Sequence, residues 1–209
     1  MPRPSTLVLL VRHGQTPTTG KLLPGRAPGL HLADEGRRQA EAVAARITRL
    51  RKVAAIYSSP LERARETAAP IARARHLALR IERGLMEADV GDWTGKSLKR
   101  LRLRAEWRAV QYHPGGFRFP GGESFAELQA RVVTTLSRLA EQHHGETIVA
   151  VSHADPIKLA VAYAMGTHLD LFQRVAIGLC SVSAIVYRPE GPLVLTVNSM
   201  DGDLVAFGA

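Results

Sequence analysis

Residues 7–16 read Leu-Val-Leu-Leu-Val-Arg-His-Gly-Gln-Thr, and this stretch decides the fold. Its five leading apolar residues place Val and Leu on both faces, which is typical of a buried strand covered on both sides. Ligands of open α/β sheets bind beyond the carboxyl ends of the strands, so Arg12 and His13 are expected to point into such a crevice, with Gly14 allowing a tight turn. An Arg-His pair that merely ends a strand in solvent would look the same, so the rest of the chain must decide.

Length and composition indicate one globular domain. The chain has 209 residues, of which 45% are hydrophobic and 22% charged, and this favours a single domain over 1–209. No apolar run approaches the roughly 20 residues that cross a bilayer, and no signal-peptide cleavage pattern follows the apolar stretch, so we expect no membrane partner and a cytoplasmic location. Cys180 is the only cysteine and lies among apolar residues, which predicts a buried thiol without a disulfide.

The formal net charge of +9 suits an anionic partner. Zinc-finger, RNA-recognition and helix-turn-helix patterns are not recognisable, so a nucleic-acid partner is not expected. Much of the excess is Arg spread along presumed helix faces, where a solvated basic surface is the simpler explanation. The charge alone does not choose a partner, and a homodimer is left open.

The remaining pattern alternates strands and helices, which predicts the α/β class: a mostly parallel central sheet with helices on both faces. The expected elements are a Pro- and Gly-rich loop over the site (17–36), a helix (36–51), two short strands (54–57 and 77–81), a helical excursion that could serve as a lid (about 88–123), a helix after Ser124, a central strand (147–151) and a closing hairpin (174–187 with 193–198).

Two helix starts carry capping signals. Ser59 as N-cap, Pro60 at N1 and Glu62 at N3 predict a helix whose first turn holds Arg63. The free N–H groups of a helix N-terminus favour an anion, and Arg63 adds a forked donor there. Ser124 with Glu127 predicts a second capping box.

The central strand at 147–151 delivers Ser152 and His153 to its carboxyl end, which repeats the arrangement of the first motif. Arg12, His13, Arg63 and His153 are therefore expected in one crevice. Two guanidinium forks and a second imidazole suit a phosphate dianion. A neutral His13 could attack phosphorus and form a covalent intermediate, and the leaving oxygen then needs an acid with a raised pKa, for which Glu87 is the candidate.

At this point the chain resembles the histidine phosphatase superfamily, also called phosphoglycerate mutase-like, and its phosphatase branch more than its glycolytic mutases. The resemblance rests on five blocks in the family's order, which span nearly the whole chain: Leu-Val-Arg-His-Gly-Gln-Thr (10–16), Ser-Ser-Pro-Leu-Glu-Arg-Ala (58–64), Leu-Met-Glu with Gly-Asp-Trp-Thr-Gly (85–95), Gly-Gly-Glu-Ser (121–124) and Val-Ser-His-Ala (151–154).

The resemblance implies a role for each candidate residue. His13 would be the phosphorylated nucleophile, and Arg12, Arg63 and His153 would hold the phosphoryl group. Glu87 would donate the proton and later act as base for water. It implies no metal and no organic cofactor.

The chain departs from the family in the loop after the first motif. The family often has Trp-Asn where this chain has Pro17-Thr18-Thr19, so Thr19 is the candidate to replace the Asn on phosphate. Pro24 stands where members carry a polar residue, so loop contacts to substrate are not transferred. We expect His143 and His144, at a helix end, to lie on the surface.

Three functions fit these observations. The first is a phosphomonoester hydrolase for a small phosphorylated metabolite. The second is a phosphomutase of the phosphoglycerate mutase type, and the third is a catalytically weak module that binds polyanions. For substrate selectivity, we expect cations of the excursion to line the site and favour a second anionic group; they are Lys96, Lys99, Arg100, Arg102, Arg104, Arg108 and Arg118. Trp93, Trp107, Phe117 and Phe119 would wall an apolar part.

Overall fold

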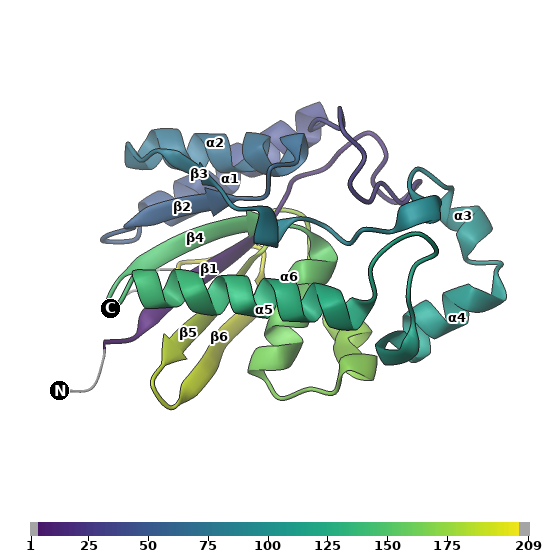
Figure 1. Ribbon diagram of the computed structural model, residues 1–209. Coiled ribbons are helices and arrows are strands. Elements are labelled where there is room, and N and C mark those ends of the chain that lie inside the picture. The colour runs from purple at the N-terminus through teal and green to yellow at the C-terminus, as the bar shows by residue number, and fades with distance from the viewer. Residues whose placement is uncertain (1–3, 205–209) are drawn as a thin grey trace.

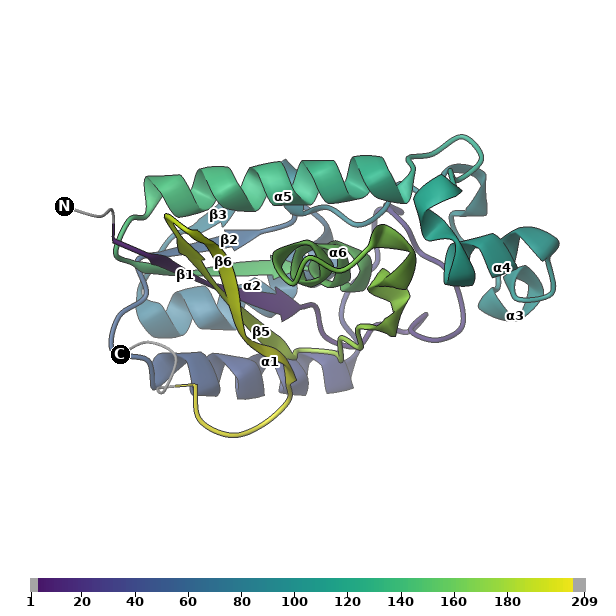
Figure 2. The ribbon, with the colours of Figure 1, turned by 90° about the horizontal axis from the view of Figure 1, so that it is seen from below.

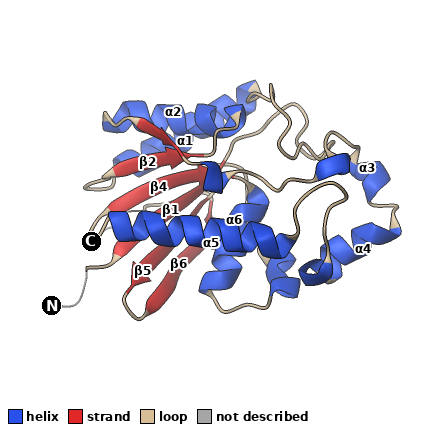
Figure 3. Cartoon of the chain, in the orientation of Figure 1, coloured by secondary structure: helices blue, strands red, loops and turns tan. Residues whose placement is uncertain are grey.

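The computed structural model describes residues 4–204, which form a six-stranded sheet in the order β3-β2-β4-β1-β5-β6 (Figures 1 and 3). The strands are β1 (Thr6–Arg12), β2 (Ala55–Ser58), β3 (Leu79–Ile81), β4 (Thr147–Ser152), β5 (Val182–Arg188) and β6 (Gly191–Ser199). Strands β1 to β4 run parallel, whereas β5 is antiparallel to β1 and forms a hairpin with β6. The predicted mostly parallel α/β sheet is confirmed.

Helices cover both faces of the sheet. One face carries α1 (Asp34–Thr48) and α2 (Glu62–Arg75), and the other carries α5 (Phe125–Gln142) and α6 (Ala154–Ala164) (Figures 1 and 2). Beyond the carboxyl ends of the parallel strands lie the short helices α3 (Leu98–Leu101) and α4 (Ala105–Tyr112). Within 4–204, no helix is both long and apolar enough to cross a membrane.

The composition of β1 explains the two covered faces. Leu7, Leu9 and Val11 belong to the core with α1 and α2, whereas Val8 and Leu10 belong to the core with α5 and α6. Alternate residues of a strand point to opposite faces, so an uninterrupted apolar run fills both layers. As a result, β1 has room for polar residues only at its ends, which are Thr6 and Arg12.

The structure confirms one predicted cap and contradicts the other. Ser124 Oγ accepts from the Glu127 N–H at 3.2 Å and Glu127 Oε2 accepts from the Ser124 N–H at 2.9 Å, which completes the capping box of α5. The prediction of Ser59 as N-cap with Glu62 at N3 is wrong, because α2 begins at Glu62 after an N-cap at Leu61 without a side-chain cap. The Ser59 hydroxyl bonds His153 instead, 2.8 Å away.

Three further expectations have clear outcomes. Cys180 is buried, as predicted. The hairpin arm begins at Val182 rather than Arg174, because Leu169–Arg174 forms the 3₁₀ helix η4. The surface position expected for His143 is wrong: the ring is buried, with Nε2 2.9 Å from the Tyr57 hydroxyl and Nδ1 2.6 Å from Glu146.

The predicted excursion of about 88–123 contains α3 and α4, which lie past the carboxyl ends of the strands (Figure 1). Of three other 3₁₀ turns, η1 (Arg83–Leu85) precedes the excursion, and η2 (Gly91–Trp93) and η3 (Pro114–Gly116) lie within it. The single-domain boundaries of 1–209 stay a prediction, and residues 1–3 and 205–209 lie outside the described residues.

Candidate active site

A pocket of about 630 Å³ lies where β1 and the loop after it meet α4 and α6. Arg12, His13 and Glu87 line it, and Arg63 and His153 are fully buried beside them. All five residues expected in the site therefore lie in one region, although they come from four separate segments of the chain.

His13 follows β1 and is only 6% exposed. Its Nδ1 lies 2.8 Å from the Gly14 carbonyl, which can only accept, so Nδ1 carries the proton and Nε2 the lone pair. Burial, followed by the charge of Arg63, lowers the pKa of His13 to about 3. The ring is thus neutral near pH 7. The chain turns at Gly14, close to Gly36. A Cβ at position 14 would clash with the Gly36 carbonyl oxygen, 2.6 Å away, so this close approach requires a residue without a side chain.

Arg12 and Arg63 are buried guanidinium groups with spare donors. Arg12 Nη1 donates to the Ile177 carbonyl at 2.6 Å, and Arg63 Nη2 donates to the Gly25 carbonyl at 2.8 Å. Across residues 4–204, nothing accepts from Arg12 Nε, Arg63 Nε or Arg63 Nη1. Burial lowers the pKa of both groups, yet Arg stays charged in proteins. Buried charged donors without acceptors are costly, and an anion would satisfy them.

His153 is the N-cap of α6 and has no exposed surface. Its ring centroid lies 5.2 Å from that of His13, and its Nε2 lies 2.8 Å from Ser59 Oγ. No acceptor or donor in the described chain reaches its Nδ1. Burial and the charge of Arg63 hold the pKa of His153 well below its usual value, so this imidazole is neutral too.

Glu87 is a partly buried carboxyl on the same pocket. Loss of water, followed by the charge of Asp155, raises the pKa of Glu87 to about 7. The bond that its Oε1 accepts from the Ala88 N–H, 2.9 Å long, and the positive charges of Arg63 and Arg12 limit that rise. Such a group can both give and take a proton near neutral pH.

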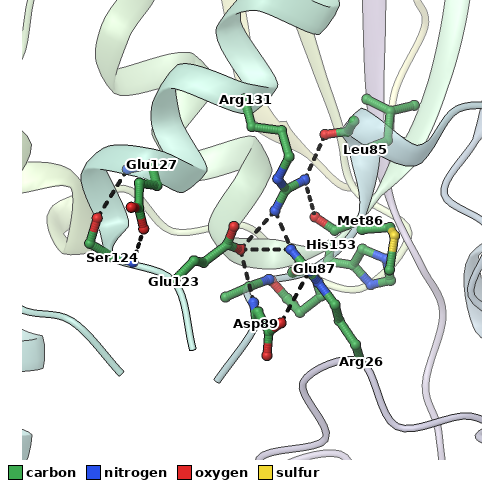
Figure 4. Close-up of polar contacts among 12 residues, drawn as sticks. Arg26, Leu85, Met86, Glu87, Asp89, Glu123, Ser124, Glu127, Arg131 and His153 are labelled. Atoms are coloured by element: carbon green, nitrogen blue, oxygen red, sulfur yellow. Dashed lines mark hydrogen bonds and ion pairs between the residues drawn. The ribbon is translucent and has the colours of Figure 1, made fainter. Parts of the chain in front are cut away.

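Behind Glu87, the carboxylate of Glu123 joins two arginines (Figure 4). Glu123 Oε1 accepts from Arg26 Nη2 at 2.9 Å and from Arg131 Nη2 at 2.8 Å. Arg26 Nε donates to the Glu87 carbonyl at 2.9 Å, and Arg131 Nη1 donates to the Met86 carbonyl at 3.0 Å. The sequence analysis gave Glu123 no role, although the Gly-Gly-Glu-Ser block that contains it was one of the five that carried the resemblance.

Arg26 and its neighbour Gly25 also connect Arg63 to the segment that carries Glu87. The neighbouring Gly25 carbonyl accepts from Arg63, while Arg26 itself bonds the Glu87 carbonyl. Residues 25 and 26 therefore link the buried guanidinium group of Arg63 to the backbone that carries the Glu87 carboxyl.

The cations expected from the excursion are mostly elsewhere. Of the seven, only Arg102 lines the pocket. Arg118 bonds the Gly122 carbonyl and the Glu127 carboxylate at the start of α5, and the other five are exposed outside the pocket. Lys158 of α6 and Arg174 line the pocket instead, and neither was singled out from the sequence. A charge pattern on a short helix does not reveal which way its side chains face.

Part of the expected apolar wall is present. Trp107 and Phe119 line the pocket, whereas Trp93 and Phe117 pack behind them, with ring centroids 6.2 Å apart for Trp93 and Trp107 and 5.1 Å apart for Phe117 and Phe119. The wall is thus supported from behind by a continuous aromatic cluster.

The loop after β1 forms the near side of the pocket, as expected. Thr16, Thr18, Thr19 and Pro24 all line it, and Thr19 Oγ1 accepts from the Thr16 N–H at 2.9 Å. A contact between Thr19 and phosphate stays a prediction. Within the described part of the chain, no three His, Cys, Asp or Glu side chains are grouped as a metal site would require.

Comparisons with known proteins agree with this geometry. A sequence model described as "Histidine phosphatase superfamily (branch 1)" matches residues 8–200. Bifunctional protein Rv2228c of Mycobacterium tuberculosis is 34% identical over 202 residues, which cover 95% of this chain, but the chain spans only 55% of that relative's length. Phosphoserine phosphatase 1 of Hydrogenobacter thermophilus is 30% identical over 196 residues, 91% of each chain.

A solved structure gives the same result for the fold. The phosphoserine phosphatase of Entamoeba histolytica, crystallised in complex with 3-phosphoglyceric acid, superposes with a TM-score of 0.82 at 27% identity, over 93% of this chain and 97% of that one. The match of the family model over nearly the whole chain, together with the shared fold, establishes that this chain belongs to the histidine phosphatase superfamily.

Proposed function

We propose that the protein is a phosphomonoester hydrolase that acts on a small phosphorylated metabolite through a phosphohistidine at His13. The observation that carries the proposal is the state of the His13 ring. Its Nδ1 is committed to the Gly14 carbonyl and its pKa is about 3, so Nε2 has a free lone pair at neutral pH. A neutral imidazole beside charged donors without acceptors is suited to attack phosphorus.

The phosphoryl group binds between the two arginines and His153. The spare N–H groups of Arg12 and Arg63 match the oxygens of a phosphate dianion. When the Ser59 hydroxyl donates to His153 Nε2, the ring proton lies on Nδ1, which then donates to a third oxygen. These donors are in place before substrate arrives, so they stabilise developing charge without reorganisation.

The reaction proceeds in two displacements. First, the Nε2–P bond forms as the ester P–O bond breaks, and Glu87 gives its proton to the leaving oxygen. Water then attacks phosphorus, Glu87 accepts a proton from it, and the N–P bond breaks. The products are the alcohol and inorganic phosphate. A carboxyl with a pKa of about 7 is suited to both proton transfers.

Relatives support a small substrate. The Hydrogenobacter and Entamoeba proteins are named phosphoserine phosphatases, and both match more than nine-tenths of this chain. A phosphomutase and a polyanion-binding module are the competing functions. Turnover separates the binding module from the proposed hydrolase, and the acceptor of the phosphoryl group separates the mutase from it.

The test is turnover of nitrophenyl phosphate and of alkyl phosphates, with His13→Ala as the variant and His113→Ala, an exposed residue past α4, as the matched control. We expect wild type and control to release inorganic phosphate and His13→Ala to release none. A rapidly quenched reaction should carry an acid-labile, base-stable phosphate on His13. Full activity of His13→Ala, or phosphate found on His153, contradicts the proposal. Transfer to an added alcohol in preference to water indicates a mutase, and no turnover at all indicates a binding module.

A further inference from the structure

The pocket is much larger than a phosphoryl group. Its volume of about 630 Å³ lies within the range of about 300 to 1,000 Å³ that is typical of pockets for whole small-molecule ligands. Space therefore remains beyond His13 for the alcohol part of a substrate, and the side chains around that space carry information on its chemistry.

Lys158 is the most enclosed cation of this outer part. It projects from α6 and its side chain is 18% exposed. Its Nζ donates to Gln173 Oε1 at 2.9 Å and lies 3.6 Å from Asp155 Oδ1. An ammonium group has three donors, so at least one stays available to a ligand.

Lys158 does not stand alone. Arg174 follows Gln173 directly and lines the same pocket, as does Arg102 after α3. Once Arg12 and Glu87 are assigned to the reaction, the remaining charged groups of the wall are these three cations and the carboxylate of Asp155. The outer pocket therefore has excess positive charge.

Apolar side chains of the same pocket strengthen that field. Trp107, Val110 and Phe119 line the pocket and are mostly or fully withdrawn from water. Low-dielectric walls focus the field of nearby charges and raise the attraction for an anion that enters between them. The same apolar side chains offer contact to a short carbon skeleton.

We propose that Lys158 and Arg174 form a second anion subsite, so that the substrate is a phosphomonoester whose alcohol part carries a carboxylate or a second phosphate. The inference rests on the proposed function and adds the substrate class to it. The phosphate ester lies against His13, the carbon skeleton lies along Trp107 and Phe119, and the second anion lies between Lys158 and Arg174.

The test uses substrate pairs that differ mainly in the second anion. Phosphoserine is compared with phosphoethanolamine, phosphoglycerate with glycerol phosphate, and an alkanediol bisphosphate with its monophosphate. The readout is the ratio of kcat/KM within each pair, because general damage to the reacting groups cancels in a ratio. The variants are Lys158→Met and Arg174→Gln. Arg100→Gln is the matched control, since Arg100 is exposed and outside the pocket.

We expect wild type to favour the dianionic member of at least one pair by tenfold or more, mainly through KM. The favoured pair tells whether a carboxylate or a phosphate occupies the subsite. Each variant should lower that ratio about tenfold, as the loss of one charge-assisted contact predicts, and added salt should lower it in wild type. Arg100→Gln should leave it unchanged.

The second anion subsite is overturned if wild type hydrolyses nitrophenyl phosphate but its kcat/KM ratio is near one in every pair, or if that ratio is unchanged in both variants. If wild type hydrolyses none of these phosphates, the proposed function is refuted instead. Arg174 is exposed, so Arg174→Gln keeps the proposal testable even when Lys158→Met fails to fold.

Discussion

Replacement of Glu87 by Gln should stabilise the unliganded protein at alkaline pH and leave its stability unchanged in acid. The pKa of Glu87 is raised from 4.5 to about 7 in the folded state. Below pH 4.5 the carboxyl is protonated in both folded and unfolded chains, so the raised pKa has no cost. Between pH 4.5 and about 7 the unfolded chain loses this proton while the folded protein keeps it, so stability falls across that range and levels off above it.

The magnitude follows from the same pKa. One pKa unit corresponds to about 1.4 kcal/mol, so the cost reaches at most about 3 kcal/mol above pH 8, and less to the extent that Glu87 remains in contact with water. For a chain of this size each kcal/mol moves Tm by about 2 to 4 °C. Glu87→Gln resembles the protonated acid, so its Tm should exceed that of wild type by roughly 5 to 10 °C near pH 9.

Thermal unfolding followed by circular dichroism from pH 4 to 9, in buffer without phosphate, measures this difference. Glu106→Gln, an exposed carboxylate on α4, supplies the background. A Tm difference that is the same at pH 4 and pH 9, or that becomes more unfavourable with rising pH, refutes the reasoning. The same variant should lose activity on alkyl phosphates, so the site would gain stability as it loses function.

Two further variants test the supports of the site. Glu123→Gln removes the charge that joins Arg26 to Arg131, and we expect the free energy of unfolding to fall by about 2 kcal/mol. Because Glu87 moves, kcat should fall more for alkyl phosphates than for nitrophenyl phosphate. Equal losses of kcat on both substrates would contradict a role through Glu87. Ser59→Ala leaves His153 Nε2 buried without its partner, which should cost about 1 to 3 kcal/mol by chemical denaturation and lower kcat/KM; wild-type values for both would show that the 2.8 Å contact is dispensable.

The sequence predicted that Arg12, His13, Arg63 and His153 lie together, and it did so for a topological reason. Parallel strands place their carboxyl ends at one edge, so polar residues that follow separate apolar runs must come together there. Arg12 at the end of β1, His13 after it, Arg63 after β2, and His153 after β4 obey this rule. The rule requires only the identification of buried strands, and β1 and β4 are buried over nearly all of their length.

Local patterns failed where a partner distant in sequence competes for the same group. Ser59 satisfies the capping-box pattern, yet its hydroxyl bonds His153, 94 residues away. His143 follows a polar helix end, yet it is buried through the Tyr57 hydroxyl, 86 residues away. Glu123 lies in a Gly-rich loop, and only the folded chain brings Arg26 to it from 97 residues away. Spacing rules describe neighbours within one element and carry no information on such partners.

The successful and the failed predictions have one physical cause. The site places charged side chains in a buried region, where folding usually places apolar ones. Arg63 is buried and Arg12 is partly buried, both have buried N–H groups that donate to no acceptor within residues 4–204, and His13 and His153 are held neutral beside them. Buried charged donors without acceptors cost stability in the free protein. Under the proposed function, a phosphate dianion would accept from these donors and reduce the repulsion between the cations, so substrate binding should stabilise the fold. Burial and periodicity in the sequence indicate the strands that deliver these residues. The bonds from Ser59 to His153 and from Glu123 to Arg26 and Arg131 are found only in the folded chain.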